Sequence, residues 1–192
     1  MILTREDLRH QLKRREIAPV YILFGPETYL RDIAAKTICN LSFAVGAARD
    51  FNETEFSLNI EGNLRDALSA AEQLPMMAQR RVIQITDVRV SATAARGDTL
   101  REDDEAALAA YLEKPSETSV VIVIADEFDK RRKVAKTLID KATAVEFTEL
   151  RDEEPARLGV TARTERAFAR LHDAVAIDER AVGLGPRARG ED

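Results

Sequence analysis

Residues 25–32 have the types and spacing to be compared with a phosphate-binding loop. Gly25 follows the apolar run Val20–Phe24, and helical periodicity begins a few residues after it. In a working P-loop, Gly-Lys-Ser/Thr stands five, six and seven residues after the first glycine, where it holds the phosphates and Mg²⁺ of a nucleotide. Those three positions hold Leu30, Arg31 and Asp32 in this chain.

These residues keep the frame of the loop and lose its chemistry. Leu30 puts a bulky side chain where phosphate oxygens would lie, and Asp32 puts a carboxylate where a hydroxyl would hold Mg²⁺ beside an anionic nucleotide. We therefore interpret residues 25–32 as a degenerate P-loop and expect no nucleotide or other cofactor. Two alternatives stay open: Gly25 serves only a tight strand-to-helix turn, or helix N–H groups and Arg31 still bind an anion.

A pair of acidic residues follows the most apolar stretch of the chain. Val120–Ile124 is a run of five β-branched residues, and Asp126 and Glu127 come shortly after it. A strand that ends in Asp-Glu resembles the metal-binding and water-activating pair of an ATPase. Such carboxylates need a Mg·nucleotide opposite them, which the degenerate loop cannot readily hold. We therefore expect the pair to lie in a solvated turn where the strand leaves the core.

A basic run comes next, after Asp129. It consists of Lys130, Arg131, Arg132 and Lys133. A run of this kind is typical of a solvated helix start, and contact with DNA or a partner protein is the alternative interpretation.

The segment Leu74-Pro75-Met76-Met77 is the candidate for protein binding. Two adjacent residues of a helix diverge by ~100°, so both methionines cannot face one core from a helix. One interpretation buries one methionine and leaves the other partly exposed, and the residues alone favour it. The other has Pro75 end the helix, so that both thioethers project as an adaptable apolar plug.

Composition limits the classes of function. The chain has 192 residues, 45% hydrophobic and 33% charged, with a net charge of −5. This balance fits one core of ordinary size and argues against a strongly basic nucleic-acid binder. No apolar run approaches the ~20 residues that cross a bilayer, so we expect no membrane contact. The single cysteine, Cys39, fits a reducing cytoplasm and a buried structural role. Nothing in the sequence positively indicates catalysis.

The order of apolar segments predicts an α/β fold. We expect strands at 20–24, 50–52, 82–85, 120–124 and 145–147, with helices at 4–15, 30–43, 64–74, 102–112 and 133–141. Strands that alternate with helices indicate a parallel five-stranded sheet with helices on both faces, similar to P-loop NTPases. This domain is expected to occupy 1–150. Residues 151–192 hold eight arginines and no lysine, and are expected to form marginal helices or a disordered tail.

Four segments occur in an order and spacing that resemble a known family. They are Tyr21–Leu30, Phe51-Asn52, Leu74–Val82 and Asp129–Lys133. Together they resemble the delta subunit of bacterial DNA polymerase III, the wrench of the sliding-clamp loader, over about residues 1–150. The resemblance implies an AAA+-like domain without a usable nucleotide site.

The resemblance also implies a function. Met76 and Met77, framed by Leu74 and Pro75, align with an apolar pair that enters a pocket of the clamp and helps to open one of its interfaces. Many relatives carry an aromatic residue where this chain has Met77. The implied protein is a non-catalytic subunit of a DNA-directed DNA polymerase (nucleotidyltransferase) holoenzyme in the cytoplasm. Its implied partners are the sliding clamp, the motor and delta-prime subunits of the loader and, indirectly, primer–template DNA.

The resemblance ends near residue 150. Family members continue into a helical lid and a collar that joins five subunits, and this chain is expected to hold at most a partial lid, near Ile177–Val182, and no collar. The alternatives to a loader subunit are an active P-loop NTPase or kinase with an atypical loop, and a truncated inert relic.

Overall fold

The computed structural model describes residues 2–61, 63–92, 98–100 and 102–148 of the chain. Within these residues six parallel strands form one sheet in the order β1-β6-β2-β5-β4-β3. The strands are β1 (Ile2–Leu3), β2 (Val20–Phe24), β3 (Glu53–Ser57), β4 (Arg81–Val90), β5 (Ser119–Phe128) and β6 (Thr143–Glu146). The helices are α1 (Arg5–Lys13), α2 (Thr28–Ser42), α3 (Asn63–Glu72), α4 (Glu102–Glu113), α5 (Lys133–Lys141) and the 3-10 turn η1 (Arg49–Phe51).

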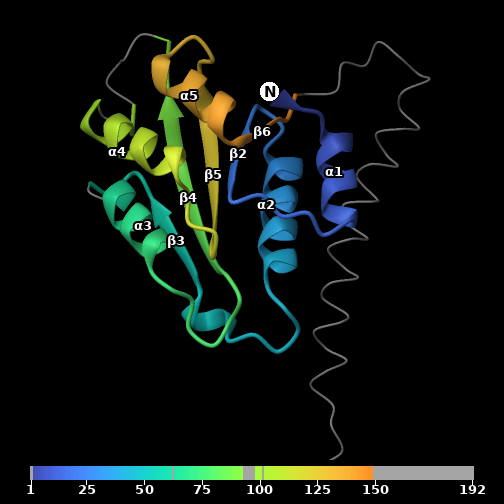
Figure 1. Cartoon of the computed structure of the whole chain (residues 1–192). Coiled ribbons are helices and arrows are strands. Elements are labelled where there is room, and N and C mark those ends of the chain that lie inside the picture. Colours follow the sequence, from blue (N-terminus) through green and yellow to red (C-terminus); the bar gives the residue numbers. More distant parts are fainter. Residues whose placement is uncertain (1, 62, 93–97, 101, 149–192) are drawn as a thin grey trace, which may run out of the picture.

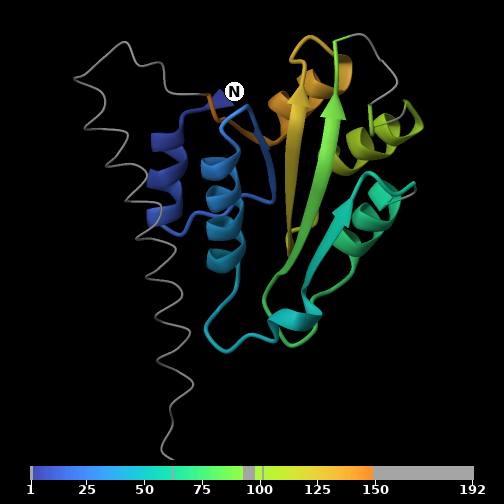
Figure 2. The ribbon, with the colours of Figure 1, turned by 180° about the vertical axis from the view of Figure 1, so that it is seen from behind.

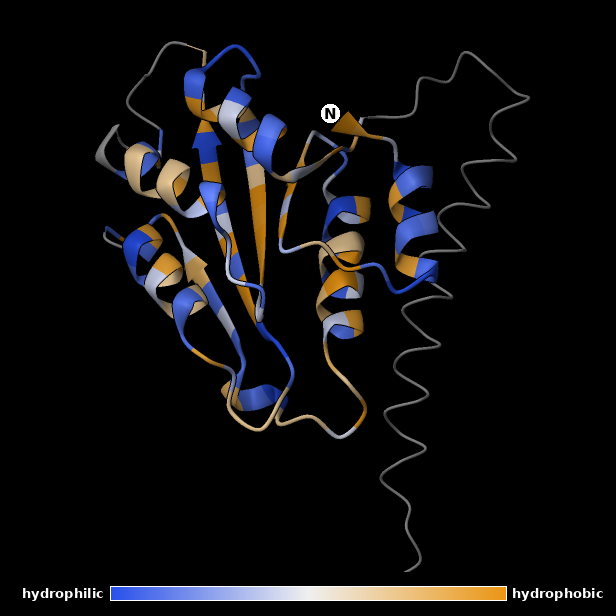
Figure 3. Cartoon of the chain, viewed as in Figure 1, coloured by the Kyte–Doolittle hydropathy of each residue, from blue (hydrophilic) through white to orange (hydrophobic). Residues whose placement is uncertain are grey.

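The helices cover both faces of the sheet. Figures 1 and 2 show α1 and α2 on one side of the strands and α3, α4 and α5 on the other. Each helical layer closes over its own apolar core, and Figure 3 shows the hydrophobic residues gathered on the strands between the layers. β2 is buried along its whole length, as its continuous apolar run predicts for a strand covered on both faces. The predicted α/β fold with a parallel sheet is confirmed.

Local signals placed several elements correctly. Thr4 caps α1: its hydroxyl accepts a hydrogen bond from the Asp7 N–H, and the Asp7 carboxylate accepts one from the Thr4 N–H. The hydrogen bonds from Thr4 also hold the pKa of Asp7 below its ordinary value. A capping box therefore starts the helix that was expected at 4–15.

The strand count differs from the expected five. β1 has two residues, too few to leave a pattern in the sequence, and it pairs with β6. The strand expected at 50–52 is wrong: Arg49–Phe51 form η1, and the strand begins after it, at Glu53. β4 runs to Val90 instead of ending at Ile85, because its ladder with β5 resumes after a register shift near Asp87, a residue with a φ of +58°.

Part of the sequence interpretation lies outside the described residues. This holds for the expected tail at 151–192 and for the domain boundary at residue 150, which stays a prediction. Within the described part of the chain, no helix combines the length and apolar character that crossing a bilayer requires.

Candidate functional site

Gly25 lies in a turn that only glycine fits. Its φ is +119°, and a Cβ atom at this position would come within 2.3 Å of the carbonyl oxygen of Phe147. The Phe147 N–H donates to the carbonyl of Phe24 (2.7 Å), and the Glu27 N–H donates to the carbonyl of Phe147 (3.1 Å). The close approach of the chain after β6 therefore accounts for Gly25 without a phosphate.

The next three candidate residues belong to the first turns of α2. Leu30 is buried in the core under α2, and Asp32 is exposed. The Arg31 side chain is 5% exposed, and its guanidinium donates to the carbonyl of Ala125 (2.8 Å) and to Asp126 Oδ1 (2.7 Å). The cation thus bonds to the carboxyl end of β5, so these donors are not directed at a phosphate.

We expected Asp126 and Glu127 to lie in a turn. This expectation is wrong, because β5 continues through both residues to Phe128. The Phe128 ring packs against Phe24 with 4.6 Å between ring centroids. Both carboxylates are exposed, as predicted, and that of Asp126 is paired with Arg31. No group of three or more acidic, His or Cys side chains in the described residues is arranged to hold a metal ion.

A cleft of about 280 Å³ lies beside Arg31, between α2 and the polar face of β3 and β4. Its charged lining residues are Arg31, Asp32, Lys36, Glu55, Asp87 and Asp126. Four carboxylates against two cations, one of them already paired with Asp126, make this cleft unsuited to a polyphosphate.

The basic run after Asp129 is largely paired within the molecule. Lys130 bonds Glu146 at 2.9 Å, Arg131 bonds Asp129 at 2.8 Å, and Arg132 bonds Asp98 at 3.1 Å. The hydrogen bond from Arg131 lowers the pKa of Asp129 to about 2. Lys133 begins α5, as the interpretation of a helix start requires. Contact of this run with DNA or a partner stays a prediction.

Cys39 is buried in the core under α2, as predicted for a structural thiol. Burial raises the pKa of the thiol far above its ordinary value, so Cys39 carries no thiolate at neutral pH.

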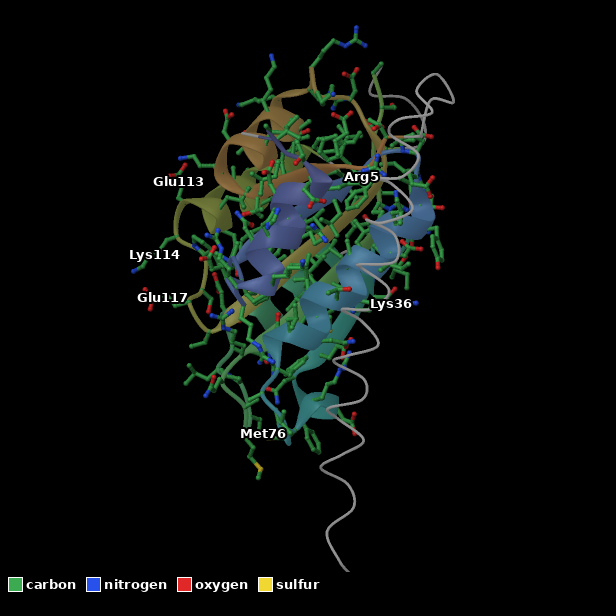
Figure 4. All side chains as sticks on the ribbon, turned by 90° about the vertical axis from the view of Figure 1, so that its right-hand side faces the viewer. Arg5, Lys36, Met76, Glu113, Lys114 and Glu117 are labelled. Atoms are coloured by element: carbon green, nitrogen blue, oxygen red, sulfur yellow. The ribbon has the colours of Figure 1, made fainter. Side chains whose placement is uncertain are left out.

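Both methionines of the candidate plug project from the molecule. α3 ends at Glu72, and residues 73–80, which we call the methionine loop, lead to β4 without regular structure. Met76 is 47% exposed and Met77 85%, and Leu74 beside them is 79% exposed. Figure 4 shows Met76 extending away from the ribbon at one end of the molecule. The interpretation that buries one methionine in the core is therefore wrong.

The methionine loop is fixed by a buried asparagine that sequence reasoning gave no role. The Asn52 side chain, 0% exposed, donates to the carbonyl of Met76 (2.7 Å) and accepts from the Met76 N–H (2.7 Å). It also donates to the carbonyl of Ala48 (2.6 Å). Phe51-Asn52 stood out as a motif, but nothing near it in the sequence reveals a partner 24 residues away.

The methionine loop and the degenerate P-loop lie at opposite ends of the sheet. The methionine loop precedes the amino end of β4, whereas Gly25 follows the carboxyl end of β2, and the strands are parallel. The apolar loop is therefore a separate site from the crevice where α/β proteins bind nucleotides.

Comparison with known proteins decides the family. Residues 21–148 match the sequence model of the DNA polymerase III delta subunit. The chain belongs to the DNA polymerase III delta subunit family. The matched residues of this delta-family chain include both the degenerate P-loop and the methionine loop.

Individual relatives agree with this assignment. The DNA polymerase III subunit delta of Bacillus subtilis is 30% identical over 165 residues, which cover 83% of this chain and 46% of the relative. This chain therefore spans about half the length of the curated relative that it matches. A solved structure, the Bacillus subtilis DNA clamp loader delta protein, has a TM-score of 0.64 at 24% identity and covers 93% of this chain and 58% of its own.

A second solved structure shows the same fold at lower identity. It is a DNA polymerase III gamma subunit-related protein from Thermotoga maritima, with a TM-score of 0.50 at 14% identity over 93% of this chain and 60% of that protein. The AAA+-like fold of the delta-family chain is thus shared with both solved structures.

Proposed function

We propose that this delta-family chain is a non-catalytic clamp-loader subunit that binds and helps to open the sliding clamp during DNA replication, with Met76 and Met77 as its plug. One observation carries the proposal: two adjacent methionine side chains are exposed on a loop whose backbone is held by the buried Asn52. Free apolar side chains on a fixed backbone are suited to enter a pocket of a partner.

The energetics favour such a plug. Transfer of two methionine side chains from water to an apolar pocket contributes roughly 3–6 kcal/mol before entropy costs. The hydrogen bonds from Asn52 hold the Met76 backbone in one conformation before association, so less conformational entropy is lost on binding. The thioethers themselves stay flexible and can adapt to the shape of the pocket. Leu74 and Pro75 complete the edge of this surface.

The degenerate P-loop supports a role without nucleotide chemistry in this subunit. Leu30 is buried, and the Arg31 guanidinium is bonded to Ala125 and Asp126. In this proposal ATP acts in the motor subunits, which expose or hide the methionine loop. The further partners are the delta-prime subunit and, through the assembled loader, primer–template DNA.

The test is a titration of the chain against a purified bacterial sliding clamp by surface plasmon resonance. The double variant Met76→Ser, Met77→Ser should weaken binding about 100-fold or more, because roughly 3 kcal/mol or more of apolar contact is lost. Tyr29→Ser removes an aromatic side chain that is 66% exposed at the opposite end of the sheet, and it should leave binding unchanged. Equal binding by the double variant and the wild-type chain would exclude the methionine loop as the plug.

A further inference from the structure

We propose that the clamp-binding surface of the methionine loop extends to Phe51 in η1, and that Phe51 is an aromatic anchor for the same clamp. This inference rests on the proposed function. It concerns a residue outside the methionine loop, on a segment more than 20 residues earlier in the chain.

Phe51 and the methionine loop are held side by side. Asn52, the next residue, bonds both backbone groups of Met76 through its side chain. Arg81, which follows the methionine loop, donates to the carbonyl of Phe51 at 3.5 Å. Figures 1 and 2 show η1 and the loop before β4 together at the same end of the sheet. The two segments therefore form one surface, although they are far apart in sequence.

The exposure of Phe51 needs an explanation. Phe51 is 61% exposed at the end of the three-residue turn η1. A polar residue would fit such a turn equally well, so the fold itself does not require an aromatic side chain at this position. The described residues contain seven large, exposed hydrophobic side chains, and four of them, Phe51, Leu74, Met76 and Met77, lie on the two segments that Asn52 joins. Single exposed apolar residues are ordinary, but a group of them gathered on two adjoining segments is typical of an interaction surface.

The occupant follows from continuity with the methionine loop. A pocket that receives Met76 and Met77 must come close to η1, because Asn52, the neighbour of Phe51, bonds the Met76 backbone and keeps the Cα atoms of Phe51 and Met76 within about 10 Å of each other in space. Aromatic residues next to the centre of an interface carry a disproportionate part of the binding energy. The sliding clamp is therefore the partner that covers Phe51.

The experiment measures the dissociation constant of the full chain and a purified bacterial sliding clamp for three variants. Phe51→Ser should weaken binding tenfold or more, and Phe51→Leu should recover part of this loss, because an apolar contact is restored. Tyr29→Ser is the matched control, since Tyr29 is 66% exposed on α2 at the opposite end of the sheet. Circular dichroism melting curves should be similar for all three, because both aromatic side chains are mostly exposed.

Two outcomes overturn the inference and leave the proposed function intact. The first is wild-type affinity in Phe51→Ser together with lost binding in Met76→Ser, Met77→Ser. The second is wild-type clamp affinity in Phe51→Ser together with a changed self-association of the chain in sedimentation equilibrium, which would assign Phe51 to contacts between two copies. If no variant affects clamp binding, the proposed function itself fails.

Discussion

The side chain of Asn52 bonds to both the N–H and the carbonyl of Met76, each at 2.7 Å. An amide side chain that meets a backbone unit in this way replaces the ladder partner that an irregular loop lacks. Because the Asn52 side chain is fully buried, its amide is shielded from water and depends on these protein partners for its hydrogen bonds. Asn52 is thus a positioning residue. It is buried beneath the methionine loop, and its hydrogen bonds fix the position of the Met76 backbone.

The first prediction concerns this pair. Asn52→Ala should lower the free energy of unfolding by about 1–3 kcal/mol, because it removes three part-buried hydrogen bonds to the backbones of Met76 and Ala48. It should also weaken clamp binding. Urea denaturation and surface plasmon resonance measure the two effects. Asn63→Ala, which removes a 2.7 Å hydrogen bond to the Ser57 carbonyl, should affect stability alone. Clamp affinity unchanged in Asn52→Ala would contradict the positioning role.

The second prediction separates stability from binding at Met77. Its φ is +53°, a left-handed conformation that costs an ordinary residue about 1–2 kcal/mol and costs glycine little. Met77→Gly should therefore leave the free energy of unfolding within about 1 kcal/mol of wild type, on the stabilising side, because strain relief offsets the entropy of glycine. Clamp affinity should fall, because an 85% exposed apolar side chain is lost.

Met76→Gly is the control for this backbone effect. Met76, unlike Met77, does not have a positive φ, so glycine relieves no backbone strain at this position. Met76→Gly should therefore destabilise the protein by about 0.5–1 kcal/mol. Equal stability changes in the two glycine variants would show that the conformation of Met77 is not strained.

The third prediction concerns Arg31. Arg31→Ala should destabilise the protein by roughly 2–4 kcal/mol, because it removes hydrogen bonds to Ala125 and Asp126 and leaves a buried carbonyl unpaired. Isothermal calorimetry with Mg·ATP should show no heat for the wild-type chain or the variant. Arg14→Ala, which loses only an exposed pair with Glu16, should cost less than about 1 kcal/mol. Nucleotide binding that depends on Arg31 would restore the P-loop interpretation.

The fourth prediction tests the domain boundary near residue 150. Phe147 is fully buried, and its backbone bonds Phe24 and Glu27. A chain that ends after residue 148 should therefore unfold cooperatively in urea. Phe147→Ala in the full chain should cost about 3–5 kcal/mol. Loss of cooperative unfolding in the chain that ends after residue 148 would show that later residues belong to the core.

Periodicity and composition were enough to predict the alternation of strands and helices. β2 and the core of β5 are runs of apolar residues, and the start of α1 carries a capping box, so each signal is local. β1 was not predicted, because two residues are too few to show a hydrophobic period. The second half of β4 was not predicted, because Thr86 and Asp87 interrupt its apolar pattern. Pro75 correctly marked the end of α3, which is why the plug could be proposed at all.

The interactions that define the two sites could not be predicted in this way. Arg31 bonds residues 94 and 95 positions away, and Asn52 bonds one 24 positions away. Such pairs depend on which strands become neighbours, and one sequence does not reveal that. The degenerate P-loop was recognised because the residues that bind phosphate and Mg²⁺ are replaced. The requirement for glycine at position 25 could not be recognised in this way, because it comes from a tertiary contact with the backbone of Phe147.

The last prediction is a pH effect at Asp98. Burial alone would raise the pKa of this carboxyl, but hydrogen bonds from the side chain and the N–H of Ser91, together with the Arg132 guanidinium, outweigh burial and lower the pKa below its ordinary value of 3.8. The folded protein therefore binds this proton more weakly than the unfolded chain does. The contribution of Asp98 to stability is fully present above the ordinary pKa and is lost as the pH falls through the lower folded value.

Asp98→Asn should thus be less stable than wild type by about 1–2 kcal/mol at pH 7. Urea denaturation should show this difference shrink below about pH 4, when the wild-type carboxylate takes up its proton. Asp7 and Glu53, whose pKa values are also lowered, titrate in both proteins, so the difference isolates Asp98. A difference of the same size at pH 7 and pH 3 would mean that the charge of Asp98 does not stabilise the fold.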